Sequence, residues 1–370
     1  EPRQITKGSK AWKNQAEWSP KSTHLVYSDR TMTLWLVDAS TGRKTEIDKA
    51  SAEEIRDYTF SHDGDWVAYS KSSPNYQSAL WLYQISTGQK QQITDATFSD
   101  SSPMFSRDGK FLFFLSNRDF NLAFSSFEFD YLYNNATRIY AIPLRNDGTT
   151  LSPTKNDVEP YGDEDKEDES EEKDGSKKDD KITIDLEGIQ NRVEVLPMPN
   201  GNYNILGSVD EGLLYSSGNK TMRYNIKEEK SEDIIEGVGY VIPSADGKSL
   251  IYRRNSEFMI TKNQPGQKVG DGRIDLTHLV MKIDPKAEWN QIYEDAFRIF
   301  RDYFYVDNIH GVDWDGIKET YGKMLPYVPS RFDLDYILNE VISETNTGHA
   351  YVDWGDIGSV DRINGGLLGA

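Results

Sequence analysis

The histidine at position 349 could act as a proton-transfer group. It lies in the stretch ETNTGHAYV, residues 344–352, between a segment of helical periodicity and a short alternating run. An imidazole titrates near neutral pH, so it can accept a proton from a nucleophile and return it to a leaving group. The chain has no cysteine, which excludes thiolate nucleophiles and zinc-thiolate sites. On the residues alone, a structural role and a catalytic role for His349 both stay open.

The other four histidines supply no second catalytic group. His24 and His62 lie in expected strands or turns, His278 in a linker and His310 in a glycine-containing loop. The sequence lacks the HExxH zinc pair, the phosphate-binding Walker loop, the GxSxG nucleophile turn and the dinucleotide fingerprint. It therefore predicts no metal and no cofactor.

The composition limits the classes of partner. Lys and Arg total 42 against 61 Asp and Glu, a net charge of -19, and 12% of the residues are aromatic. This balance indicates a folded protein and argues against nucleic-acid binding, because phosphate backbones attract basic patches.

No apolar run approaches the roughly 18 residues of a membrane span. The N-terminus has no apolar signal-peptide core and begins in what resembles the middle of a pattern, so we expect further sequence upstream.

A repeated unit fills residues 1–273. An apolar residue, a turn containing Ser, Pro, Asp or Gly, and an alternating strand recur at a period of roughly 40–45 residues. Copies occupy Ala16–Ser28, Tyr58–Ser70, Pro103–Ser116 and Val241–Arg253, with a looser copy at Gly201–Ser217. The Asp-Gly pairs at 63–64, 108–109 and 246–247 suit tight turns, and second hairpins begin at Trp35 and Trp81. We predict a partial β-propeller of about five blades. This fold does not by itself identify a catalytic activity.

One insertion interrupts the repeats. Residues 163–180 carry 11 acidic and 4 basic side chains with no apolar residue. Such a composition cannot bury a core, so we expect a disordered insertion over 161–181. It lacks the spacing of a calcium-binding loop.

The periodicity becomes helical after residue 273, in a module that we place at 274–354. Asp284-Pro285 is a typical helix start. Asp313 begins a second helix that Pro326 and Pro329 end, and Ser330 or Asp333 caps a third. The next residues alternate, and as a strand they would put His349, Tyr351 and Asp353 on one face. The fold class is therefore mainly β with a C-terminal α-helical module.

The helical stretch from Trp314 to Val352 resembles the core domain of the tricorn protease family, relatives of the C-terminal-processing serine peptidases. The propeller part is similar too, in EIRDYTFSHDGDWVAYSK, SNRDFN and DLEGIQNRVEVLPMPNGNY. The family's catalytic histidine lies in an N-T-S-H-A-Y type motif, which matches residues 346–351 with Gly348 in place of Ser. The resemblance implies that His349 is the general base. It also implies that 355–370 begin a PDZ-like domain and that the nucleophilic serine lies outside this chain.

The expected function is therefore part of a tricorn-like serine peptidase that hydrolyses peptides or unfolded polypeptides. We expect the chain alone to be inactive, and the whole protein could form homo-oligomers. The alternative is a non-catalytic propeller scaffold for protein interactions. Localisation would be cytoplasmic, or periplasmic or secreted if an export signal precedes this sequence.

Overall fold

The computed structural model describes residues 3–119, 122–133, 135–152 and 181–352, together with the single residues 355 and 365. The chain divides into two compact units, the first ending at Leu276 and the second beginning at Thr277; the short segment Lys10–Trp12 belongs to the second. Most of the acidic insertion and most of 355–370 lie outside the described residues, so the predictions made for them are not addressed.

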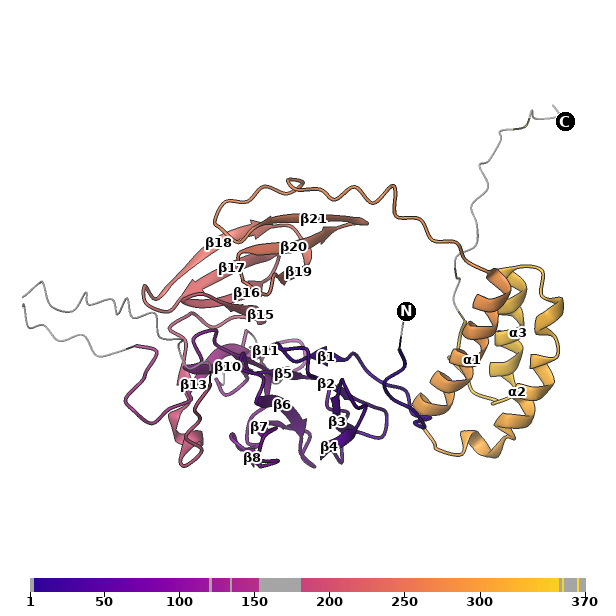
Figure 1. The fold of residues 1–370 in the computed structure, drawn as a ribbon, viewed down its shortest axis with the longest axis horizontal. Coiled ribbons are helices and arrows are strands. Elements are labelled where there is room, and N and C mark those ends of the chain that lie inside the picture. The colour runs from indigo at the N-terminus through magenta and orange to yellow at the C-terminus, as the bar shows by residue number, and fades with distance from the viewer. Residues whose placement is uncertain are drawn as a thin grey trace, which may run out of the picture. The chain divides into compact units, whose positions relative to one another are not determined.

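The first unit consists of antiparallel sheets (Figure 1). Each copy of the repeat lies in a different sheet. The first sheet has β1 (Glu17–Trp18), β2 (His24–Ser28), β3 (Thr33–Asp38) and β4 (Lys44–Lys49), and the second has β5 (Tyr58–Phe60), β6 (Trp66–Ser72), β7 (Ser78–Gln84) and β8 (Lys90–Gln92). The third, in the order β14-β13-β10-β9, has β9 (Asp100–Phe105), β10 (Phe111–Ser116), β13 (Arg138–Pro143) and β14 (Glu194–Val195).

The fourth sheet has β15 (Tyr203–Val209), β16 (Gly212–Ser217), β17 (Lys220–Asn225) and β18 (Lys230–Glu236), and the fifth has β19 (Gly239–Pro243), β20 (Ser249–Arg254) and β21 (Glu257–Lys262). A separate hairpin, β11 (Leu122–Ser125) and β12 (Asp130–Tyr133), lies in the connection between β10 and β13. A 3₁₀ turn, η1 (Ile189–Arg192), precedes β14.

Each large apolar cluster of this unit is shared by two successive sheets. On β6, Val67 and Tyr69 belong to the cluster with the first sheet, whereas Trp66 and Ala68 belong to the cluster with the third. Neighbouring residues of a strand point to opposite faces, so both faces of β6 are buried against another sheet. The same holds for β10, and the fourth and fifth sheets share a further cluster. Sheets stacked face to face in chain order are propeller-like, and the predicted fold class is confirmed.

The Asp-Gly pairs make the turns that the sequence predicts. Ser61 donates its hydroxyl to the Asp63 carboxylate and accepts from the Trp66 N–H at 3.0 Å, and Gly64 has φ +78°. The side chain thus holds the turn while glycine takes the left-handed conformation without a Cβ penalty. The same bonds recur at Ser106, Asp108 and Gly109 and at Ser244, Asp246 and Gly247.

The second unit is a helical module of α1 (Pro285–Tyr303), η2 (Ile309–Gly311), α2 (Trp314–Gly322), η3 (Leu325–Tyr327) and α3 (Arg331–Ser343). Asp284 accepts from two N–H groups at the start of α1, and Asp313 accepts from the Gly316 N–H at 3.0 Å at the start of α2. Ser330, the first of the two predicted candidates, caps α3. Helix α2 ends at Gly322, earlier than the two prolines predicted.

The helices of this module enclose one core, built mainly from α1 and α3. It comprises Tyr293, Phe297, Val328, Leu334, Ile337, Leu338 and Val341. Trp314 at the start of α2 stacks on Phe300 and donates its indole N–H to the Phe297 carbonyl at 3.2 Å. Aromatic side chains of α1 and α2 thus form much of the packing of this module.

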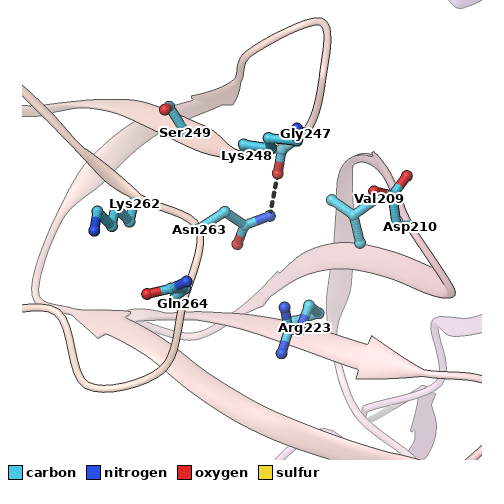
Figure 2. Close-up of a pocket in the computed structure, with 9 residues that line it drawn as sticks. All are labelled: Val209, Asp210, Arg223, Gly247, Lys248, Ser249, Lys262, Asn263 and Gln264. Carbon is cyan, nitrogen blue, oxygen red and sulfur yellow. Dashed lines mark hydrogen bonds between the residues drawn. The ribbon is translucent and has the colours of Figure 1, made fainter.

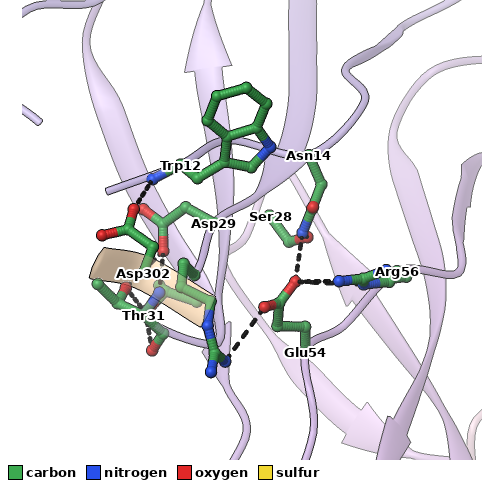
Figure 3. A network of polar contacts seen from close by, with 10 residues as sticks. Trp12, Asn14, Ser28, Asp29, Thr31, Glu54, Arg56 and Asp302 are labelled. Atoms are coloured by element: carbon green, nitrogen blue, oxygen red, sulfur yellow. Dashed lines mark hydrogen bonds and ion pairs between the residues drawn. The ribbon is translucent and has the colours of Figure 1, made fainter. Parts of the chain in front are cut away.

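Two carboxylates whose side chains are largely buried hold chain segments outside regular strands and helices (Figure 3). In the second unit, Asp302 accepts from the Trp12 N–H at 2.7 Å and so binds Lys10–Trp12 to α1. In the first unit, the side chain of Glu54 is 4% exposed and accepts from Asn14 at 2.9 Å, from Arg56 at 3.0 Å and from Arg30 at 3.2 Å. Both carboxylates have charged or amide donors, as buried charges require.

Within the described residues, no helix is long and apolar enough to cross a membrane.

Candidate functional site

His349 lies six positions after the last residue of α3, in a segment without regular secondary structure. Its side chain is exposed and its φ is +59°. The predicted strand is wrong for residues 349–352, and Asp353 lies outside the described residues. A left-handed residue interrupts the extended backbone that a strand needs, and Asn346 is left-handed as well, with φ +50°. His349 is therefore presented by a turn.

Thr345 fixes the beginning of this turn. It is completely buried, its hydroxyl donates to the Ile342 carbonyl at 2.7 Å, and the Thr347 hydroxyl lies 3.1 Å from the same oxygen. At the other end, Val352 packs against the helical core. The exposed histidine thus lies between two anchored positions.

His310 provides a further anchor, which the sequence reasoning missed. Its Nδ1 lies 3.0 Å from the Thr345 carbonyl and its Nε2 hydrogen-bonds the Tyr305 hydroxyl. A carbonyl only accepts, so Nδ1 carries the proton, and in the neutral ring Nε2 then accepts from Tyr305. The only sequence signal was the glycine after His310; the partner lies 35 residues away. His310 therefore holds the turn through the Thr345 carbonyl.

The imidazole of His349 has one hydrogen-bond partner among the described residues. The Tyr351 hydroxyl lies 3.3 Å from Nδ1, and the two rings meet edge to face with centroids 6.4 Å apart. Nε2 has no partner within the described part of the chain. If Nδ1 donates to Tyr351, Nε2 carries the lone pair of the neutral ring and can take a proton.

Gly348 leaves open space beside this histidine. A Cβ built there meets no atom within 4 Å, and its φ is outside the left-handed region. The serine expected from the family motif would therefore fit.

Tyr321, from α2, donates to Glu344 at 2.8 Å, and this bond raises the pKa of Tyr321 to about 12. Its hydroxyl stays protonated at neutral pH and cannot serve as a base.

Across the described residues, no group of three or more His, Cys, Asp or Glu side chains is arranged to hold a metal ion.

Two family models match the chain. One, described as the tricorn protease second beta propeller domain, covers residues 1–264, and another, the tricorn protease C1 domain, covers residues 285–343. The chain belongs to the tricorn protease family. The matched ranges correspond to the sheets and to α1–α3, and the family prediction made from the sequence is confirmed.

Curated relatives carry the same name. The chain is 28% identical to tricorn protease homolog 1 of Streptomyces coelicolor over 379 residues, covering 95% of this chain and 35% of that protein. It is 25% identical to the tricorn protease of Thermoplasma volcanium, covering 95% of this chain and 34% of that one. A crystal structure of the tricorn protease aligns with a TM-score of 0.74 and 17% identity, over 92% of this chain and 33% of that chain. The chain thus spans about a third of the length of these relatives.

His349 lies just beyond the matched C1 range, which ends at residue 343. The match therefore accounts for the helices that carry the turn, and the case for His349 itself rests on its motif and geometry.

Proposed function

We propose that this chain is the propeller and helical part of a serine peptidase in which His349 is the general base. One observation carries the proposal: an exposed imidazole, on a turn anchored at Thr345 and Val352, whose Nε2 has no partner among the described residues. Family membership supports the reaction class, because the relatives are named as proteases.

The proposed reaction is acyl transfer from a peptide to water. Nε2 of His349 removes the proton of a serine hydroxyl supplied from outside this chain, and the serine oxygen attacks the peptide carbonyl. The resulting imidazolium returns the proton to the leaving amine, which breaks the C–N bond. Water then repeats the two steps on the acyl-enzyme, and N–H donors outside this chain hold the oxyanion. Peptides or unfolded segments are the proposed substrates.

Peptidase assays on the complete protein containing this chain test the proposal. We expect His349→Ala to lower kcat by at least about 10³-fold, because loss of a triad member commonly costs 10⁴ or more. His278→Ala is the matched control, since His278 is exposed and lies outside both matched ranges. Turnover unchanged in a folded His349→Ala protein would refute the role. Absence of any peptidase activity in the complete protein would favour the interaction scaffold.

A further inference from the structure

A cavity lies between the fourth and fifth sheets of the first unit. Its volume is about 410 Å³, within the range of small-molecule sites. Arg223 from β17, Lys262 from the end of β21 and Lys248 from the turn before β20 line it, together with Asp210 and Asn263 (Figure 2). Three cations against one carboxylate is an unusual lining in a chain of net charge -19.

The lining charges are not equivalent. Asp210 is paired with Arg107 at 3.3 Å, and Arg223 with Glu232 at 2.6 Å. Lys248 and Lys262 make no ion pair within the described part of the chain, although Asp246 is close enough to Lys248 to interact electrostatically. The cavity therefore retains positive charge that no carboxylate in contact neutralises.

Asn263 supplies the second observation. It is only 5% exposed, and its backbone N–H donates to the Lys248 carbonyl at 2.9 Å. Its side-chain Nδ2 donates to the Gly247 carbonyl, also at 2.9 Å. Because that carbonyl can only accept, the amide orientation is determined and Oδ1 must be the remaining atom. Oδ1 is buried and has no hydrogen-bond partner.

A buried acceptor without a donor is unfavourable, so a group that donates to it is favoured. From the cavity, its charge and Asn263, we propose that this site binds a small molecule that joins an anionic group to an N–H or O–H donor. The anion lies against Lys248 and Lys262, and the donor bonds Oδ1 of Asn263. The carboxyl terminus of a peptide and a hydroxylated phosphate ester both have this chemistry.

Calorimetric titration of this chain with three probes separates those sources. The probes are N-acetyl-trialanine with a free carboxylate, the same peptide as its C-terminal amide, and glycerol 3-phosphate. We expect the free peptide or the phosphate ester to bind, and the amide to bind at least about tenfold more weakly. A tenfold change corresponds to about 1.4 kcal/mol, which is typical of one charge-assisted hydrogen bond.

Lys248→Met and Lys262→Met should each weaken binding of the anionic probe by about tenfold. Both side chains are exposed, so these variants keep the fold, and thermal unfolding checks this. Lys230→Met, at an exposed position on β18 outside the cavity, is the control. Asn263→Asp should abolish binding of the anionic probe by placing a carboxylate in the cavity.

Three results would overturn the proposal. One is that neither the free peptide nor glycerol 3-phosphate binds at about 10 mM. A water molecule would then be the partner of Oδ1 of Asn263. Another is equal affinity for the carboxylate and the amide peptide, with no response to glycerol 3-phosphate. The last is unchanged binding of the anionic probe in both lysine variants.

Discussion

Replacing Glu17 by glutamine should stabilise the first unit above neutral pH. Glu17 lies on β1 and is partly buried. Burial raises the pKa of its carboxyl group to about 7, against opposing hydrogen bonds from the Thr59 hydroxyl, at 3.3 Å, and the Phe60 backbone. The nearby Asp57 carboxylate raises the pKa of Glu17 further. At pH 8 this charge is held where it is poorly solvated, and glutamine removes it with almost no change in shape.

The magnitude and its sign follow from proton linkage. The ordinary pKa of 4.5 applies to the unfolded chain and about 7 to the folded protein. Below pH 4.5 the group is protonated in both states and costs nothing. Between the two values unfolding releases a proton, so stability falls as pH rises. Above pH 7 the full penalty applies, about 3 kcal/mol at 1.36 kcal/mol per pKa unit.

Thermal unfolding of wild type and Glu17→Gln at pH 5 and pH 8 measures this difference. We expect the variant to gain about 3 kcal/mol at pH 8, or roughly 6–12 °C in Tm for a unit of this size, and under about 1 kcal/mol at pH 5. Glu46→Gln, exposed on β4 of the same sheet, should show no gain at either pH. An equal Tm for wild type and Glu17→Gln at pH 8 would refute the reasoning, and so would a gain that is the same at both pH values.

Two further substitutions test other parts of the chain. Asp48→Asn should cost about 2–4 kcal/mol in urea unfolding: the carboxylate is 6% exposed and accepts from Lys71 and Lys90, both at 2.7 Å, so its loss leaves two partly buried ammonium groups unpaired. A cost below about 0.5 kcal/mol would show that water replaces the ion pair. Gly348→Ser should change Tm by less than about 2 °C because a Cβ there meets no atom within 4 Å, and a larger loss would mean that the turn needs glycine.

Local signals in the sequence predicted much of the fold. Ser-x-Asp-Gly turns and helix caps depend on atoms only a few residues apart, so Ser61 with Gly64, and Asp284 with Pro285, could be interpreted directly. The alternation of side chains between the two faces of strands such as β6 follows from the same short-range geometry. These features do not need knowledge of a distant partner.

The features that the sequence did not predict correctly have the opposite cause. Residues 349–352 alternate as a strand does, but a strand also needs a partner for its backbone groups, and alternation does not provide one. The hydrogen bond between His310 and Thr345 joins residues 35 positions apart, so the local sequence around either residue gives no sign of it. The unpaired Oδ1 of Asn263 likewise depends on how two separate sheets meet. Tertiary contacts, which short patterns do not encode, determine all three features.

The position of His349 and the orientation of its ring have different causes. The position is determined within this chain, because Thr345 is buried and bonded to His310 while Val352 lies against the core. The orientation depends on one contact with Tyr351, which is itself 74% exposed. Such a contact restricts an imidazole weakly, whereas catalysis needs the base held within about 0.5 Å. If His349 is the base, other groups of the complete protein must also orient its ring. We then expect the ring to be held in one orientation in the complete protein, and peptidase activity to accompany that orientation.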